Sequence, residues 1–291
     1  MKILDTDEMQ DAEIILQSHL PLCMQVFGFL CSINRNKPHA LEVVVDSWPD
    51  FQVIICRPNM KNEHVKEFKK RVSFFCRDEE VFKRMVTEEN AIDWSRDLLL
   101  CFDTRHEPML KEILASMGDI MTRVTTSHIL MLYDPTLLPQ LNSDIESKVS
   151  CLNESHIDLV NKTWKFGGDG PSYRTIEHLI CQYPTCCITD DQGQPVCWVL
   201  MYDDCAMGML YTLPEHRGRG LAKALISSMS RKLHAHGYPV YSFVDEGTTV
   251  SYSLLVSLGF TEDPQYRVGL YQVNSKWADI HSVTGLLNCK L

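Results

Sequence analysis

Two arginines and two glycines alternate from Arg217 to Gly220, in the run H-R-G-R-G-L-A. Glycine has no Cβ, so the backbone at Gly218 and Gly220 can approach a ligand closely, while Arg217 and Arg219 supply positive charge. Residues from Leu221 onward have helical spacing, and the first N–H groups of a helix lack intrahelical partners. These groups and the helix dipole together attract anions. The pattern predicts a pyrophosphate site; the alternative is a turn that only begins a surface helix.

The hydrophobic pattern predicts the elements that hold this loop. Met207 to Leu213 is strand-like, and Pro214 interrupts it. The apolar residues that recur afterwards on one helical face are Leu221, Leu225, Met229 and Leu233. The loop is not a Walker loop, because no G-K-[ST] follows. The residues expected to contact the ligand are Leu213, Arg217, Gly218, Arg219, Gly220, Leu221 and Ala222.

The composition is that of a globular protein with one large or two ordinary domains. The chain has 291 residues, of which 45% are hydrophobic and 23% are charged. The net charge of −10 argues against general nucleic-acid binding, and no apolar run is long enough for a transmembrane segment. A local basic cluster favours a small phosphate-bearing ligand, the alternative being a solvated helix face. Its members are Arg217, Arg219, Lys223, Arg231 and Lys232.

The twelve cysteines are scattered and form no C-x-x-C motif. Many lie in apolar runs, which is typical of buried thiols in a reducing compartment. We expect no bound metal, since His234 and His236 are two residues apart on a helix and do not share a face. The N-terminus has neither a secretory signal nor an Arg-rich transit pattern, so we expect an intracellular protein.

In the first half of the chain, the residue pattern predicts helices and strands, which end at a turn-rich stretch between Pro135 and Ser143. Residues Thr6 to Leu20 predict a helix capped by Thr6 or Asp7, and Asn59 to Ser95 is charged and helical. The predicted strands are Gln25 to Ile33, a hairpin of Ala40 to Val45 with Phe51 to Cys56, Leu98 to Phe102, and His128 to Tyr133. We therefore place a domain boundary near residue 145.

The second half predicts the order β, α, α, β, β, β, loop, α, β, α, β. Asn153 is expected to cap the first helix, and Pro171 to be the first residue of the second. The strands are Val149 to Leu152, Cys186 to Thr189, Pro195 to Tyr202, Met207 to Leu213, Val240 to Val244, and Arg267 to Val273. The two later helices end at Gly237 and span Thr248 to Leu258.

The element R-x-x-G-x-A, formed by Arg217, Gly220 and Ala222, resembles the acyl-CoA pyrophosphate loop of the GCN5-related N-acetyltransferase (GNAT) superfamily. The order of elements in the second half matches that fold. The resemblance implies an α+β protein with two tandem GNAT-like halves. Residues 1–145 would be a degenerate N-terminal domain, and residues 146–291 would be the acyl-CoA-binding catalytic domain.

Three further segments resemble the glycine N-acyltransferase family over nearly the whole chain. They are Y-T-L-P-E-H-R at Tyr211, Y-P-V-Y-S-F-V-D at Tyr238, and V-D-S-W-P-D-F at Val45. The resemblance implies transfer of an acyl group from acyl-CoA to glycine or a similar small amine, giving N-acylglycine and CoA. It implies acyl-CoA as a co-substrate with no permanently bound cofactor, and a location in mitochondria, the endoplasmic reticulum or the cytoplasm. We expect a monomer.

The catalytic groups depart from the pattern of that family. The family's expected basic Glu corresponds to Ala206, and the candidate substitutes are Asp204, Glu215 and His216, each of which can instead be an ordinary loop residue. Many acetyltransferases carry a Tyr that protonates the thiolate, at a position that is Leu255 in this chain. Tyr252, one turn earlier, is the candidate substitute; the alternative is packing in the core.

Main-chain N–H groups of Leu210, Tyr211 or Leu213 are expected to stabilise the oxyanion. The residues expected to line the acceptor pocket are Tyr211, Tyr241, Ser242 and Asp245. Two other functions stay open: an acyl-CoA-binding protein with little transferase activity, suggested by Ala206 and Leu255, and a protein lysine acetyltransferase, whose acidic surface would attract basic tails.

Overall fold

The computed structural model describes residues 1–59, 71–140 and 143–274, and these residues fall into two compact units. Unit 1 comprises Met1–Ile129 together with the segment that begins at Asp263, and unit 2 comprises Leu130–Glu262. The chain therefore passes from unit 1 to unit 2 and back again.

Unit 1 contains a mixed sheet with the strand order β1-β2-β3-β4-β5-β12-β6. Its strands are β1 (Lys2–Ile3), β2 (Leu41–Val45), β3 (Val53–Pro58), β4 (Arg71–Cys76), β5 (Leu98–Asp103), β12 (Val268–Val273) and β6 (Met121–Met131). The predicted hairpin is confirmed, because β2 and β3 are antiparallel neighbours with Val44 opposite Ile55. The pair β4 and β5 is parallel.

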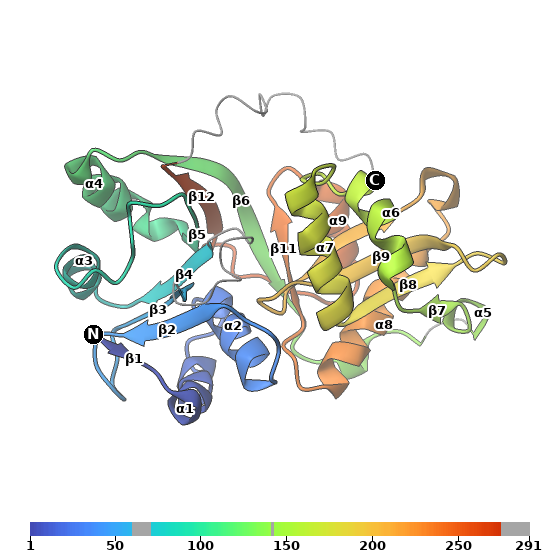
Figure 1. The fold of residues 1–291 in the computed structure, drawn as a ribbon. Helices are drawn as coiled ribbons and strands as arrows, with labels where there is room; N and C mark the ends of the chain where they lie inside the picture. The colour runs from blue at the N-terminus through green and yellow to red at the C-terminus, as the bar shows by residue number, and fades with distance from the viewer. Residues whose placement is uncertain (60–70, 141–142, 275–291) are drawn as a thin grey trace. The chain divides into compact units, whose positions relative to one another are not determined.

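Four helices cover this sheet: α1 (Thr6–Gln17), α2 (Met24–Asn34), α3 (Glu79–Thr87) and α4 (Glu107–Met117). Helices α3 and α4 lie on one side of the sheet, where Phe82 and Leu110 join a core with Phe74 and Phe102 (Figure 1). The cap of α1 is Asp5, which forms a capping box with Glu8 and is not Thr6 or Asp7 as predicted.

Two further predictions for the first half were wrong. The segment from Gln25 to Ile33, predicted as a strand, lies in α2, whose residues from Met24 to Ile33 are all buried. The charged segment from Asn59 to Ser95 includes a helix, α3, but also the strand β4. Residues 60–70 of that segment lie outside the described residues.

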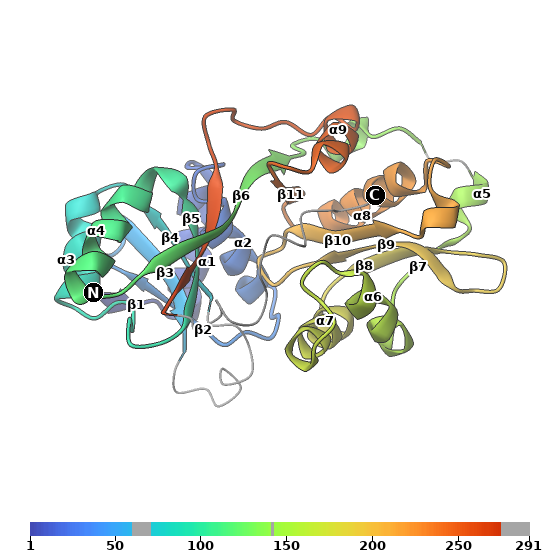
Figure 2. The same cartoon turned by 90° about the horizontal axis from the view of Figure 1, so that it is seen from above.

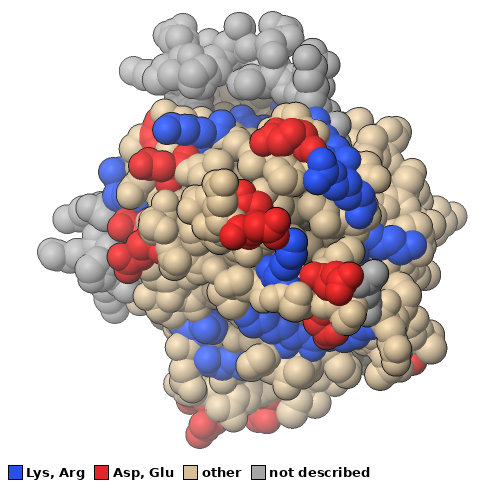
Figure 3. Space-filling model, turned by 90° about the vertical axis from the view of Figure 1, so that its right-hand side faces the viewer, with Lys and Arg blue, Asp and Glu red and all other residues tan. Residues whose placement is uncertain are grey.

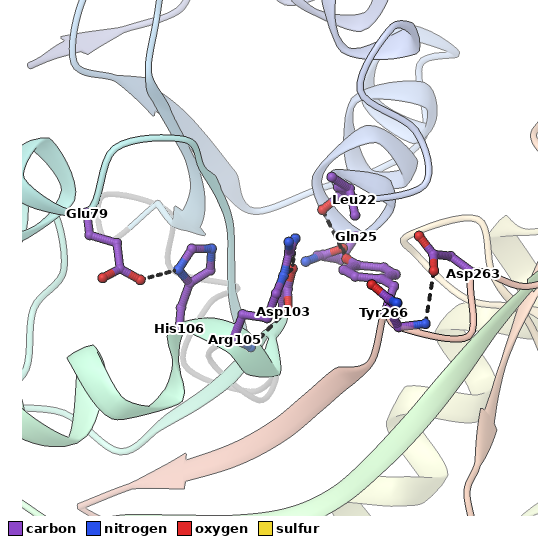
Figure 4. Close-up of polar contacts among 9 residues, drawn as sticks. Leu22, Gln25, Glu79, Asp103, Arg105, His106, Asp263 and Tyr266 are labelled. Atoms are coloured by element: carbon purple, nitrogen blue, oxygen red, sulfur yellow. Dashed lines mark hydrogen bonds and ion pairs between the residues drawn. The ribbon is translucent and has the colours of Figure 1, made fainter.

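The last strand of the second half, β12, agrees with the predicted strand Arg267 to Val273, but it pairs within the sheet of unit 1. It pairs antiparallel with both β5 and β6, so Tyr271 lies opposite Leu100 on one side and Arg123 on the other. The chain leading into it is anchored by Tyr266, which is buried and whose hydroxyl donates toward the Leu22 carbonyl, 3.0 Å away (Figure 4). Figure 4 also shows the neighbouring contact of Arg105 with Asp103.

Unit 2 contains the strand order β11-β10-β9-β8-β7. The strands are β7 (Val149–Ser150), β8 (Thr185–Thr189), β9 (Pro195–Met201), β10 (Met207–Thr212) and β11 (Tyr241–Asp245). Each agrees with a predicted strand to within two residues at either end. β7 to β10 form an antiparallel meander, whereas β11 runs parallel to β10.

The helices of unit 2 are α5 (Ser143–Glu146), α6 (Ile157–Thr163), α7 (Gly170–Gln182), α8 (Leu221–Ala235) and α9 (Thr249–Ser257). Figure 2 shows α8 on one face of the β8–β10 meander and α6 and α7 on the other. Asn153 caps the short turn Glu154–His156 that leads into α6, as predicted. Pro171 is the second residue of α7, after the cap Asp169.

The two halves of the chain have the same order of main elements, β, α, α, β, β, β, α, β, α, β, which agrees with the predicted tandem arrangement. The compact units divide the chain differently from the predicted boundary at residue 145. The division falls after Ile129, and β12 of the second half is inserted beside β5 of the first. The place of β12 is determined by hydrogen bonding between strands that are distant in the sequence, so local turn residues do not predict it.

Candidate active site

The site begins where β10 separates from β11. The two strands share the register pair Met207 with Ser242, and β10 has an irregularity between Gly208 and Tyr211, where Met209 has a φ of +53°. A Cβ at Gly208 would lie 2.1 Å from the ring of Tyr202, so only glycine fits there. An irregularity of this kind bends a strand and redirects its polar groups. Along the rest of β10, main-chain groups on the β11 side are thereby released from sheet pairing.

The amides of β10 do not all point in the same direction. The Leu213 N–H donates to the Val196 carbonyl of β9 at 2.9 Å, so the prediction that this amide serves the oxyanion is wrong. Tyr211 is opposite Trp198 and shares the orientation of Leu213, because orientations alternate along a strand. Thr212 points the other way, since its carbonyl accepts from Arg217 Nε at 3.0 Å. Thr212, which the sequence analysis missed, therefore presents its N–H on the β11 side.

Arg217 contacts the strand that precedes the loop. Its Nε bonds the Thr212 carbonyl, and its guanidinium carbon lies 5.5 Å from the centre of the Tyr211 ring. The same ring is stacked on the buried Trp198 at 5.3 Å. Cation–π contact and stacking orient the guanidinium. Tyr211, predicted to line the acceptor pocket, thus contacts the arginine of the loop.

The two glycines of the loop have left-handed backbone conformations, which the sequence analysis did not predict. Gly218 and Gly220 have φ values of +73° and +75°, and a Cβ at either position would meet no other atom within 4 Å. Gly220 is the N-cap of α8, and no side chain caps this helix. Its first intrahelical hydrogen bond is from the Ala224 N–H to the Gly220 carbonyl, so the preceding amides are available to an anion.

The matching position in unit 1 has the opposite charge. There the strand β4 leads into α3, whose N-cap Asp78 accepts from the N–H groups of Glu80 and Val81. Glu79 and Glu80 add two carboxylates to the first turn, whereas the first turn of α8 has no acidic residue. Acidic side chains occupy the helix amides and repel an anion. Of the two helices, α8 is the one suited to a pyrophosphate.

The predicted basic cluster divides into two parts. Arg219 lies in the loop and bonds the Glu215 carbonyl at 3.0 Å. Arg231 and Lys232, two or more turns further along α8, donate to main-chain carbonyls of Pro139 and Thr185, so they hold elements together. On the face of the molecule drawn in Figure 3, Lys and Arg are interspersed with Asp and Glu. Of the predicted cluster, Arg217 and Arg219 are therefore the members that lie in the loop itself.

The candidate bases lie at opposite ends of β10. Glu215 is exposed and His216 half-buried, and both belong to the turn Pro214–His216 that follows the strand. Asp204 precedes the strand, is buried, and accepts from the Ala206 N–H at 3.2 Å. The strand between them spans about 17 Å at the usual rise per residue. The structure does not bring the three together.

The candidate acid, Tyr252, already forms a hydrogen bond within the protein. The Tyr252 hydroxyl lies 2.8 Å from Glu262 Oε1, and Leu255 is buried. Of the predicted pocket residues, Tyr241 is fully buried and its hydroxyl donates to the Asp204 carbonyl. Ser242 donates to the Met207 carbonyl at 2.8 Å. The hydroxyls of Tyr241 and Ser242 therefore join β11 to neighbouring strands and loops, and their role in lining an acceptor pocket stays a prediction.

Two titratable residues near the site were missed by the sequence analysis. Lys165, in the loop between α6 and α7, forms an ion pair with Asp245 at the end of β11. His178 on α7 is half-buried, and burial lowers its pKa below the ordinary value while the charge of Asp203 opposes this effect. Neither has a local sequence signal, because each is brought to the strand ends by the packing of α6 and α7.

Most cysteines are buried, and buried thiols are unreactive. Nine of the eleven cysteines among the described residues are buried and all eleven are free thiols; burial raises the pKa of Cys197, for example, to about 11. Within the described ranges no group of His, Cys, Asp and Glu is arranged to hold a metal ion. No helix in the same part of the chain has the length and apolarity required to cross a bilayer.

Solved structures with the same architecture define the class of the fold. A Drosophila protein superposes with a TM-score of 0.73, at 17% identity, covering 93% of this chain and 97% of its own. The GCN5-related N-acetyltransferase from Kribbella flavida superposes with a TM-score of 0.52, at 15% identity, covering 89% and 98%. The chain has the GCN5-related N-acetyltransferase fold in two tandem halves, as predicted.

The sequence identifies the family within this fold. The profile of the aralkyl acyl-CoA:amino acid N-acyltransferases matches residues 1–184, and the profile of their C-terminal region matches residues 186–267. Human glycine N-acyltransferase is 31% identical over 259 residues, covering 81% of this chain and 86% of its own. This chain belongs to the aralkyl acyl-CoA:amino acid N-acyltransferase family, which confirms the predicted transferase class.

Proposed function

We propose that this protein transfers an acyl group from acyl-CoA to the amino group of glycine or a similar small amino acid, releasing N-acylglycine and CoA. The observation that carries the proposal is the loop from Arg217 to Gly220, which joins an irregular, separated strand to an uncapped helix. The human relative whose name states glycine as the acceptor supports the choice of substrate.

The loop would bind the pyrophosphate of CoA. The free amides at the start of α8, the φ of +73° at Gly218 and the absence of acidic residues in the first turn favour a bound anion. Arg217, oriented by Tyr211, would add a charge-assisted hydrogen bond.

The thioester would then lie along β10, on the side that faces away from β9. The amide of Thr212 points to that side, and the irregularity before it redirects the amide of Leu210 as well. An N–H in this position stabilises the oxyanion that forms when the amine attacks the carbonyl carbon. CoA leaves as a thiolate, so little acid assistance is needed. The buried Leu255, at the position where many acetyltransferases have an acidic Tyr, is therefore compatible with the reaction.

The attacking amine must lose a proton. Asp204 is the carboxylate next to Ala206, where the family resemblance places a Glu, and we place the proton transfer there, relayed by water. Glu215 and His216 belong to the loop at the other end of β10. Orientation of the two substrates would supply much of the remaining acceleration.

The test is release of the CoA thiol by the purified protein. Acetyl-, benzoyl- and oleoyl-CoA are each offered with glycine, with other amino acids and with a lysine-containing peptide. Release that depends on glycine or another small amino acid supports the proposal. Saturable binding of acyl-CoA without release would favour a binding protein, the function that Ala206 and the engaged Tyr252 suggest. Release with the peptide alone would favour a lysine acetyltransferase.

The family resemblance is also the ground for proposing that the protein acts in mitochondria. We propose separately that it is a monomer. Cell fractionation and sedimentation of the purified chain test these two points.

A further inference from the structure

Lys165 is held at the end of the strand that forms one wall of the proposed site. Its Nζ pairs with Asp245, the last residue of β11, and lies 4.7 Å from the centre of the Phe166 ring. The side chains of Lys165 and Asp245 are 33% and 26% exposed. A group that is fixed on one side and open to solvent on the other can bind a ligand.

The loop that carries Lys165 has a defined conformation. A Cβ at Gly167 would lie 2.0 Å from the Asn161 carbonyl oxygen, so the backbone there packs tightly against α6. The buried side chain of Asn161 accepts from the Gly168 N–H at 3.1 Å and from the Ser172 hydroxyl at 2.7 Å. These bonds fix both ends of the loop. Lys165 is therefore positioned by the fold, unlike an ordinary surface lysine.

An ammonium group has three hydrogens to donate. In the described part of the chain, Lys165 uses its charge on one carboxylate, that of Asp245, so donors remain for a second. The Phe166 ring, which is partly exposed, excludes water from one side of the ammonium and strengthens its electrostatic interactions. The arrangement suits a small ligand with a carboxylate.

The position on the sheet favours the acceptor as that ligand. CoA would enter from the N-terminus of α8, which packs on one face of the β8–β10 meander, whereas α6, α7 and the loop between them cover the other face (Figure 2). An amine that attacks the thioester has to approach from the face that CoA does not occupy. Lys165 lies on that side, at the end of the strand that separates from β10.

We propose that Lys165 binds the carboxylate of the amino-acid acceptor and that Asp245 positions Lys165 for this contact. The inference rests on the proposed function and deepens it, because it makes a free carboxylate the feature by which the acceptor is recognised. A protein lysine side chain or a simple amine lacks that group. Asp245, predicted as a pocket residue, acts through Lys165.

The experiment compares glycine with glycinamide, whose carboxylate is replaced by an uncharged amide. In the Lys165→Met variant, the KM for glycine should rise roughly 10- to 100-fold, the range for loss of a charged hydrogen bond. The KM for acyl-CoA and the activity with glycinamide should change less than about twofold. The matched control is Lys162→Met, one turn earlier on the exposed side of α6, which should leave all three values unchanged.

A second measurement is independent of turnover: calorimetric titration of glycine into the protein saturated with CoA. Wild-type protein should bind glycine, and Lys165→Met should bind it at least tenfold more weakly. If glycine binds but no thiol is released, the proposed function fails while the carboxylate contact stands. An equal KM for glycine in wild type and Lys165→Met, or no saturable glycine binding by wild type, would overturn the inference.

Discussion

A substitution at Gly220 tests separately the backbone conformation of the loop and its proposed contact with the pyrophosphate. Its φ of +75° is in the left-handed region, and no atom lies within 4 Å of the position that a Cβ would take. Gly220→Ala therefore causes strain without a clash inside the protein. Left-handed alanine costs roughly 1 to 2 kcal/mol, and the stiffer unfolded chain returns about 0.4 to 1 kcal/mol. The free energy of unfolding should fall by about 1 kcal/mol.

The effect on ligand binding should be larger. The new methyl group would occupy space where the backbone approaches the pyrophosphate, next to the free amides of α8. Loss of one charge-assisted hydrogen bond to a phosphate oxygen costs roughly 1.5 to 3 kcal/mol, so the Kd for CoA should rise about 10- to 100-fold. Calorimetric titration measures the Kd, and urea unfolding measures stability.

Gly193 is the matched control. It lies in the turn between β8 and β9 with a φ of +79° and also has no atom within 4 Å of its Cβ position. Gly193→Ala should lose the same stability and keep the affinity for CoA. If Gly220→Ala binds CoA within twofold of wild type, or if both variants weaken binding equally, the pyrophosphate does not lie against this loop.

Four further substitutions test other parts of the molecule. Asp204→Asn keeps the oxygen that accepts the hydrogen bond from the Ala206 N–H, and it should lower kcat by roughly 10²- to 10⁴-fold. Glu215→Gln should change kcat less than about threefold. The reverse result would place the base in the loop. Tyr252→Phe should lower kcat less than about threefold, because the hydroxyl is bonded to Glu262 and the thiolate leaves readily; a hundredfold loss would make Tyr252 the acid. Glu107→Gln tests unit 1: burial opposes ionisation of Glu107, but hydrogen bonds from Lys111, Tyr271 and Arg123 lower its pKa to about 2. The carboxylate therefore stabilises the fold above about pH 4.5 by on the order of 3 kcal/mol, and this contribution is lost as the pH falls toward 2. The stability difference between wild type and Glu107→Gln, measured by urea unfolding, should shrink over that range; a constant difference would contradict the pKa argument.

The loop was predictable from the sequence because its requirements are local. Close backbone approach at Gly218 and Gly220, and a helix beginning at Leu221, follow from residue types a few positions apart. The contact between Lys165 and Asp245 was not predictable, since it joins a loop and a strand far apart in the chain. The availability of an amide for the oxyanion also depends on register, which is why Leu213 was a wrong choice and Thr212 was missed.

The misassigned helix α2 has a different cause. Hydrophobic periodicity distinguishes a helix from a strand only when one side faces water. Residues from Met24 to Ile33 are all buried, so the run lacks the polar positions that would reveal a helical period. The hairpin of β2 and β3 was predictable because a turn separates two short runs rich in β-branched residues.

The place of β12 has a consequence for synthesis of the protein on the ribosome. The strand fills the space between β5 and β6, yet roughly 140 residues separate it from β6 in the chain. At about 5 to 20 residues per second, the nascent first half waits on the order of ten seconds with the edge of β5 unpaired. An unpaired edge can join another chain, so binding by a chaperone during this interval would favour correct assembly. Unit 1, although it begins the polypeptide, cannot complete its sheet until β12 has been synthesised.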